Sequence, residues 1–276
     1  RTYVILDMRR VQSVDVTAAH MLEQIQAILK ERDGFLIFWL NAIAPPVIDI
    51  EGIKNPEFQK LLERFSRYQF EAKFLNTTTD IGIPSFLCVL IDRSHRGPRV
   101  AVGGGCGWDV SRALMSALRE ASSVHNAFSA QAPGQILDAE HQPFSDKKFR
   151  REARILLWQN PEMYPKIEPF LSGPKQTLAE AFPNLPIFQN VAEEYSYAKD
   201  IFRKFGKGYE IYYYEVKHRV LEKIGYHVVK VIIPEIVHLY LNEALPPLGA
   251  TRLKTVPKKL GYESAKEWNP WPHPFP

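Results

Sequence analysis

The chain has 276 residues, 45% of them hydrophobic and 24% charged, which is typical of a folded globular protein and excludes disordered and fibrous classes. Its net charge of +4 comes from basic residues spread along the sequence, so no nucleic-acid partner is expected. No apolar run reaches the roughly 18 residues of a membrane span, and no signal peptide is recognisable. Cys88 and Cys106 lack the spacing of a zinc site. A cytoplasmic protein without a membrane span is therefore expected.

The first 40 residues predict a β-α-β unit. Residues 2–8 and 35–40 are short apolar runs typical of buried strands, and residues 17–30 have the periodicity of an amphipathic helix. A strand, a helix and a second strand in such a short stretch predict that the two strands pair in parallel.

The rest of the chain predicts alternating helices and strands, followed by a proline-rich tail from residue 245. Helices are expected over residues 55–68, 109–128, 147–158, 190–205 and 220–224. Strands are expected over residues 70–75, 85–92, 99–102, 210–216 and 226–233. The glycine cluster at 103–107 suggests a turn, and residues 131–143 a loop. The predicted fold class is therefore α/β, a mixed sheet with packed helices.

Residues 1–33 resemble part of a STAS domain of the type appended to SulP anion transporters. The resemblance rests on the run from Tyr3-Val-Ile-Leu-Asp7 to Asp15-Val-Thr17, where that family places a strand end and a helix cap. In regulatory relatives a hydroxyl residue after this aspartate is phosphorylated, which would assign that role to Thr17. The match covers only part of a STAS domain.

From about residue 31 to residue 276 the chain resembles the YcaO family. Four motifs occur in the family's order, at residues 31–49, 78–86, 103–121 and 272–276. They open on Glu31-Arg32-Asp33, include Thr78-Thr79-Asp80, and end on alternating prolines. We therefore expect a YcaO-like domain over residues 34–276 that lacks its N-terminal ATP-binding segment, preceded by the STAS-like strand and helix over 1–33.

The YcaO resemblance implies ATP-dependent modification of peptide backbone amides. In that chemistry a Cys, Ser or Thr side chain, or sulfide, attacks the carbonyl, and the phosphorylated amide oxygen then leaves, giving an azoline or a thioamide. The implied cofactors are ATP and Mg²⁺. The implied partners are a ribosomally made peptide or protein substrate, a partner protein that delivers it, and a second copy in a homodimer.

The YcaO resemblance also implies which residues form the site. Glu31, Arg32, Glu120 and Ser123 would bind the nucleotide, with Glu31 and Glu120 as Mg²⁺ ligands. Ile28 and Ser123 stand where the family has Glu and Gln. Weak or absent Mg·ATP binding is therefore predicted, and restoring both family residues should raise the affinity.

The C-terminal prolines are the other candidate. Pro272, Pro274 and Pro276 match the terminus of azoline-forming members, where it lies by the active site and is catalytic. Alternating prolines favour an extended conformation that loses little entropy on docking, so the tail is expected to fold back towards Glu120. The alternative is a disordered end.

Two other functions stay open. The chain could be a non-catalytic scaffold that keeps the YcaO fold to bind a peptide or protein. It could also be a STAS-type regulatory protein switched at Thr17, although that domain is truncated.

Overall fold

The computed structural model describes residues 15–94, 99–128, 151–216 and 228–275, apart from the side chains of 15–18, 31–32, 128, 151–152 and 216. The strand expected at 2–8, the loop at 131–143, the helix at 220–224 and Pro276 lie outside the described residues.

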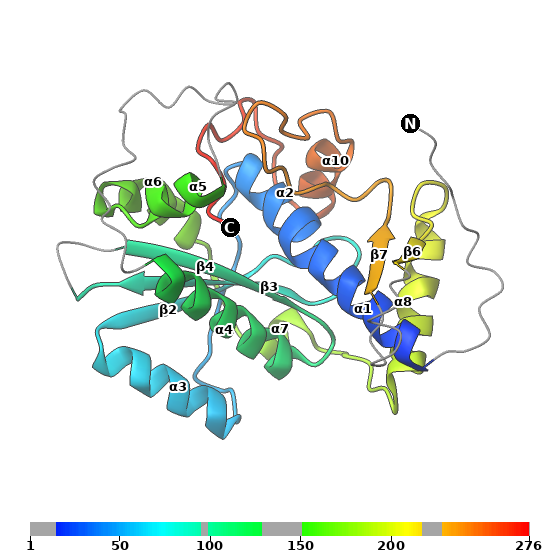
Figure 1. Ribbon diagram of the computed structural model, residues 1–276, viewed down its shortest axis with the longest axis horizontal. Helices are drawn as coiled ribbons and strands as arrows, with labels where there is room; N and C mark the ends of the chain where they lie inside the picture. Colours follow the sequence, from blue (N-terminus) through cyan, green and yellow to red (C-terminus); the bar gives the residue numbers. More distant parts are fainter. Residues whose placement is uncertain (1–14, 95–98, 129–150, 217–227, 276) are drawn as a thin grey trace.

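Groups of helices and groups of strands follow one another along the described chain (Figure 1). The helical elements are α1 (Asp15–Ile28), the π-helical η2 (Leu29–Gly34), α2 (Phe35–Leu40), α3 (Pro56–Arg67), α4 (Val110–Phe128), α5 (Arg151–Trp158), η4 (Pro161–Met163), α6 (Tyr164–Ile167), η5 (Glu168–Leu171), α7 (Leu178–Ala181), α8 (Val191–Phe205) and α10 (Arg252–Lys259). The strands are β1 (Val47–Ile48), β2 (Phe70–Asn76), β3 (Ser85–Asp92), β4 (Arg99–Cys106), β5 (Lys175–Gln176), β6 (Tyr212–Val216) and β7 (Val228–Ile232).

The main sheet is mixed and has the strand order β4-β3-β2-β1-β5. Strands β2, β3 and β4 pair antiparallel over their whole lengths, whereas β1 is antiparallel to β2 and parallel to β5. All eight residues of β3 are buried, because helices cover both faces of the sheet. The expected mixed α/β sheet is confirmed.

Alternate residues of β3 contribute to different hydrophobic clusters. Leu87 and Val89 belong to a cluster with α2, α5 and the C-terminal tail. Phe86 and Cys88 belong to a cluster with α3 and α4. Since successive side chains of a strand point to opposite faces, the sheet lies between these two helical layers.

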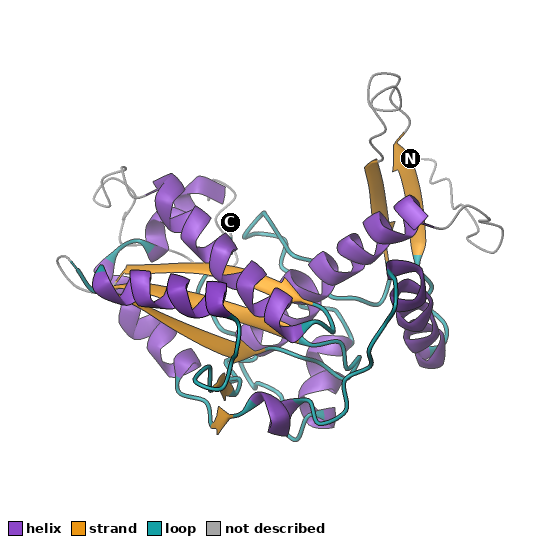
Figure 2. Cartoon of the chain, turned by 90° about the horizontal axis from the view of Figure 1, so that it is seen from below, coloured by secondary structure: helices purple, strands orange, loops and turns teal. Residues whose placement is uncertain are grey.

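A third hydrophobic cluster lies beside the sheet. It joins α1 and α8 to one face of the antiparallel ribbon β6–β7. The ribbon stands away from the main sheet (Figure 2). Residues 210–216 and 226–233 are thus confirmed as strand regions, with slightly shorter bounds.

The strand predicted at residues 35–40 is wrong, because this segment is helix α2. All six of its residues are buried, so the apolar run has no periodicity that could distinguish a helix from a strand. The chain continues from α1 through η2 into α2, and the predicted β-α-β unit with its parallel pair is not formed.

The glycine cluster was also assigned wrongly, because residues 103–105 belong to strand β4. A Cβ at Gly103 would lie 2.2 Å from the backbone nitrogen of Ala121, and one at Gly105 would lie 1.8 Å from the carbonyl oxygen of Ala113. The two glycines therefore allow the backbone of α4 to pack directly on β4.

Helix α3 begins as its sequence predicts. The side-chain oxygen of Asn55 accepts hydrogen bonds from the backbone nitrogens of Glu57 and Phe58, and Pro56 occupies the first helical turn. This cap places Glu57 at the end of α3 that faces α4.

In the described parts of the chain, none of the helices has both the length and the apolar character needed to cross a bilayer.

Candidate functional site

Lys30 and Glu120 meet at the free edge of the main sheet. Strand β4 is an edge strand, and the backbone nitrogen of Gly104 donates a 2.7 Å hydrogen bond to Oε2 of Glu120. Nζ of Lys30 lies 2.9 Å from the same oxygen and 3.3 Å from the carbonyl oxygen of Gly104. The ion pair between Lys30 of η2 and Glu120 of α4 therefore binds both the backbone nitrogen and the carbonyl oxygen of Gly104.

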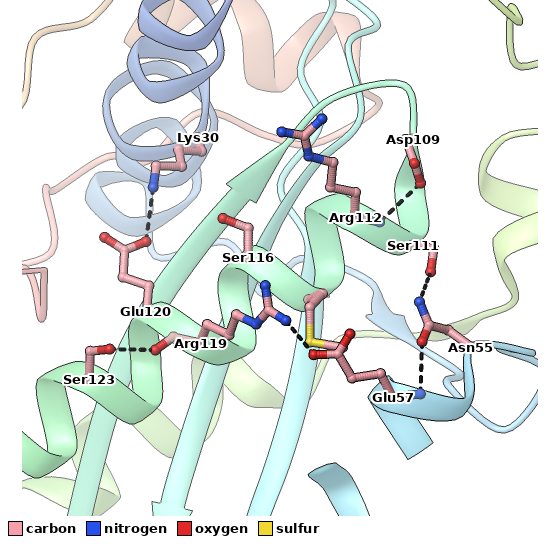
Figure 3. A pocket seen from close by; sticks show the side chains of 11 residues that line it. Lys30, Asn55, Glu57, Asp109, Ser111, Arg112, Ser116, Arg119, Glu120 and Ser123 are labelled. Atoms are coloured by element: carbon pink, nitrogen blue, oxygen red, sulfur yellow. Dashed lines mark hydrogen bonds and ion pairs between the residues drawn. The ribbon is translucent and has the colours of Figure 1, made fainter. Parts of the chain in front are cut away.

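This ion pair lies at one end of a polar pocket along α4, with a volume of about 650 Å³ (Figure 3). Besides Met115, the lining consists of cationic, carboxylate, hydroxyl and amide side chains. They are Lys30, Arg112, Arg119, Glu57, Asp109, Glu120, Asn55, Ser111, Ser116 and Ser123.

Helical spacing sets the order of groups in the pocket. Arg112, Ser116 and Glu120 are four residues apart, so they follow one another along one face of α4 over about 12 Å. Arg119 pairs with Glu57 of α3 and closes the opposite side. The pocket therefore presents a row of hydrogen-bond donors that ends at the Lys30–Glu120 pair.

The structure describes the side chains of two of the four predicted nucleotide-binding residues. Glu120 and Ser123 both line the pocket, and the hydroxyl of Ser123 donates a 2.9 Å hydrogen bond to the carbonyl oxygen of Arg119. Glu31 and Arg32 lie in η2 directly after Lys30, but their side chains are outside the described part. Their convergence with Glu120 stays a prediction, although η2 itself reaches Glu120 through Lys30.

Ile28 does not face this pocket. Its side chain is 4% exposed and belongs to the hydrophobic cluster of α1, α8 and β7. A glutamate at this position would be buried among apolar side chains, which is unfavourable for a charged group. The expectation that Glu at 28 would restore a metal ligand is therefore wrong for this chain.

His125, five residues after Glu120 on α4, contributes to a different part of the surface. Its Nε2 is 3.4 Å from Oδ2 of Asp92, and its ring packs edge-on against Phe70 with centroids 4.8 Å apart. These contacts belong to a separate hollow at the C-terminal part of α4. His125 therefore supplies no group to the pocket at Glu120.

The C-terminal tail folds back onto the body, as predicted. Pro272, His273, Pro274 and Phe275 are all buried. The Phe275 ring packs edge-on against Phe35, with centroids 4.8 Å apart. A Cβ at Gly104 would lie 3.3 Å from the Phe275 ring, so the tail reaches the same glycine that binds Glu120.

Both cysteines are free. Burial raises the pKa of the Cys106 thiol to about 12 and also raises the pKa of Cys88. Both thiols therefore stay protonated at neutral pH and are poor nucleophiles.

A buried ion network fixes η2 behind the pocket, and sequence reasoning missed it. Nε of Arg252 on α10 donates a 2.6 Å hydrogen bond to Oδ1 of Asp33, and Nη2 donates one of 2.6 Å to Asp80. Asp80 also pairs with Lys259, so two cations of α10 bind its carboxylate. The family motifs around Asp33 and Asp80 are thus tied to the C-terminal segment.

Sequence reasoning also missed Lys30, Arg112 and Arg119. Their signals were present, since Lys30 precedes the Glu31-Arg32 motif and Arg112 is eight residues before Glu120 on one helix. The i, i+4 spacing could have shown Arg112 on the face of Glu120. The contact between Lys30 and Glu120 depends on tertiary structure.

Solved heterocyclases share the fold. The structure of the heterocyclase TruD matches with a TM-score of 0.67 and 22% identity, covering 92% of this chain and 32% of that chain. A heterocyclase in complex with substrate and cofactor matches with a TM-score of 0.72 and 21% identity, covering 92% and 31%. YcaO from Methanopyrus kandleri, bound with AMPPCP and Mg²⁺, matches with a TM-score of 0.54 and 14% identity, covering 78% and 51%.

This chain thus spans about a third of the length of the two heterocyclases. Among curated proteins, none matches it. The matches give no support to a STAS-like segment over residues 1–33. The family described as YcaO cyclodehydratase, ATP- and Mg²⁺-binding, matches residues 27–237, which is more than half of the chain. The chain therefore belongs to the YcaO family.

Proposed function

We propose that this chain is the nucleotide-binding and peptide-modifying part of a YcaO-type enzyme that uses ATP to modify peptide backbone amides. One observation carries the proposal. The pocket along α4 gathers cations and Glu120 at the edge of β4, and the C-terminal tail docks at the same Gly104. Membership of a family described as ATP- and Mg²⁺-binding supports the general chemistry.

The residues present fit the phosphates of a nucleotide. Lys30 and Arg112 supply cations to the row along α4, and Arg119 supplies a third beside Glu57. Cations and hydroxyl donors are the groups that bind transferring phosphates. The pocket volume of about 650 Å³ is within the range of small-molecule sites. When bound, ATP would supply the phosphoryl group that converts an amide oxygen into a leaving group.

The carboxylates at the family's metal positions are Glu31 and Glu120. Among the residues that the structure describes, no three His, Cys, Asp or Glu side chains gather closely enough to hold a metal ion. Mg²⁺ at nucleotide sites needs only one or two carboxylates, because phosphates and water complete its coordination. Glu31, Arg32 and Ser123 stay proposed nucleotide contacts on this basis.

The docked tail supports a role for the terminal prolines. Pro272 and Pro274 are buried, and Phe275 brings the end of the chain to Gly104. We propose that Pro272, Pro274 and Pro276 fix this part of the chain beside the reacting amide. This role matches that of the terminus in azoline-forming relatives.

The reaction would be cyclodehydration to an azoline or thioamidation. The substrate would be a ribosomally made peptide, brought by a partner protein, and the enzyme would act as a homodimer in the cytoplasm. The division of the chain into a segment up to residue 33 and a domain from residue 34 stays a prediction. Elements α1, η2 and α2 follow one another without a break across this position.

A non-catalytic scaffold is the second candidate, and two observations favour it. Ile28 is part of the hydrophobic core where the family has a carboxylate, and Lys30 already neutralises Glu120. A chain that kept the fold but lost metal-dependent ATP use would show both features. Peptide binding without ATP hydrolysis would support this candidate.

Calorimetric titration of the full chain with ATP in Mg²⁺ buffer tests the proposal. We expect binding that falls about tenfold or more in Glu120→Ala, since the carboxylate that holds the Lys30 ammonium in the pocket is lost. Glu63→Ala, an exposed glutamate on α3, is the matched control and should bind as the wild type does. Absence of ATP binding, which the residues at positions 28 and 123 predict as one outcome, would contradict the ATP-dependent function and favour the scaffold.

A further inference from the structure

We propose that Lys30 is a built-in cation that occupies the place of a divalent metal at Glu120, so that this pocket binds nucleotide phosphates without requiring Mg²⁺. The proposal rests on the proposed nucleotide site and specifies how that site neutralises charge. It assigns to Lys30 a role in ligand specificity.

The contacts of Glu120 leave little room for a metal. Its Oε2 already accepts from Nζ of Lys30 at 2.9 Å and from the backbone nitrogen of Gly104 at 2.7 Å. The side chains of Lys30 and Glu120 are only 17% and 27% exposed, so water screens the pair weakly. Glu120 is thus satisfied by a cation and an amide that both belong to the chain.

A divalent ion at this carboxylate would meet the ammonium directly. Mg²⁺ binds carboxylate oxygens at about 2.0–2.1 Å, so an ion on Oε2 of Glu120, or one shared by both of its oxygens, would lie close to Nζ of Lys30. Repulsion between the two cations at such separations is strong in a partly buried site. Metal binding at Oε2 would therefore require Lys30 to leave Glu120.

Lys30 is held in this position by packing. A Cβ at Gly104 would lie 3.1 Å from Cδ of Lys30, so the lysine stem lies directly on the glycine. A Cβ at Gly34 would come within 2.5 Å of the carbonyl oxygen of Thr77, which shows that η2 is seated tightly against the loop after β2. The ammonium is therefore a fixed charge in the pocket.

Arg112 completes an environment for phosphate. It stands two helical turns before Glu120 on the same face of α4 and lines the same pocket as Lys30 (Figure 3). Cationic side chains on one side of a pocket can bind adjacent phosphate oxygens of a nucleoside triphosphate. The pocket lining thus offers Lys30 and Arg112 as donors to phosphate oxygens, while the carboxylates of Glu57, Asp109 and Glu120 balance the charges of its three cations.

The test is calorimetric titration of ATP into the full chain, once in EDTA and once in Mg²⁺ at equal ionic strength. We expect the wild type to bind ATP in EDTA with an affinity within about threefold of that in Mg²⁺. Lys30→Met should lose about tenfold or more of the metal-free affinity, because a charged hydrogen-bonding partner is removed. Lys60→Met, which changes an exposed lysine on α3 outside the pocket, should bind as the wild type does in both buffers.

The outcomes separate this inference from the proposed function. Binding that requires Mg²⁺ in the wild type would overturn the inference and leave the function standing. Binding in neither buffer would contradict both. Unchanged metal-free binding in Lys30→Met would also overturn the inference. If that variant does not fold, Lys30→Met combined with Glu120→Gln removes both charges, and the same loss of metal-free binding is expected.

Discussion

Trp39 Nε1 donates a 3.1 Å hydrogen bond to the carbonyl oxygen of Trp271, and Trp158 Nε1 donates one of 3.1 Å to the next carbonyl, that of Pro272. The two indoles pack edge-on, with centroids 5.5 Å apart. Helices α2 and α5 therefore hold consecutive carbonyl groups of the tail. Since proline has no backbone donor, its carbonyl is the polar group through which the backbone can be fixed.

The docked tail should resist exopeptidases. A carboxypeptidase that accepts proline should leave the last five residues of the folded wild type intact, because residues 272–275 are buried. Trp158→Phe should speed their loss, since the carbonyl of Pro272 loses its donor. Mass spectrometry of timed digests measures the effect.

Trp108→Phe is the matched control, because Trp108 belongs to the cluster of α1 and α8, where its ring packs against Phe188 and Tyr197. It should digest at the wild-type rate. Rapid release of the last five residues from the wild type would contradict a docked tail.

Ile28→Glu should destabilise the protein without improving Mg·ATP binding. The side chain is 4% exposed within an apolar cluster, so an unpaired carboxylate there should cost about 3–5 kcal/mol of unfolding free energy. Ile28→Val should cost only about 0.5–1.5 kcal/mol. Urea unfolding measures both, and wild-type stability in Ile28→Glu would place residue 28 outside the core.

How far the fold follows from the sequence depends on the periodicity of each segment. Strands β2 and β3 were predictable because short apolar runs end at turn residues. Helix α2 was not, because it is enclosed on all sides and its six apolar residues fit either structure. The glycines of β4 resembled a turn because sequence alone does not show that a helix packs against them.

The residues of the candidate site could also be predicted only in part from the sequence. Glu120 was predictable because it lies in a motif, and Ser123 because it lies one turn further along. Lys30 was not, since its partner is 90 residues away and the contact exists only when η2 reaches the edge of β4. Ile28 was misassigned because a motif position does not reveal which way the side chain points in the π-helical join between α1 and α2.

Arg252→Met should be strongly destabilising. Arg252 is 2% exposed and pairs with Asp33, which is fully buried, so its removal leaves an uncompensated charge that costs about 3–5 kcal/mol. Adding Asp33→Asn should recover part of this loss, because the stranded charge is removed. Arg203→Met breaks an exposed pair with Asp200 and should cost about 0–1 kcal/mol. Equal effects of Arg252→Met and Arg203→Met in urea unfolding would contradict the buried network.

His273 is a neutral group within the docked tail. Burial, with Arg154 nearby, lowers its pKa to about 3, and Nε2 donates a 2.7 Å hydrogen bond to the carbonyl oxygen of Tyr240. The unfolded chain should protonate this imidazole near pH 6.5. Between pH 6.5 and about 3 the unfolded state therefore binds more protons than the folded state, and the stability from His273 is lost as the pH falls.

The wild type should consequently lose stability on mild acidification, and His273→Gln should lose less. Each pH unit below 6.5 costs up to about 1.4 kcal/mol for one such group, so the loss from pH 6.5 to pH 5 should reach about 2 kcal/mol. Glutamine cannot titrate, yet its amide can still donate to the Tyr240 carbonyl. Urea unfolding at the two pH values measures both slopes, and the contributions of other carboxylates and histidines cancel in the difference between wild type and variant. Identical slopes would show that His273 is accessible to protons in the folded protein and that the tail is not closed around it.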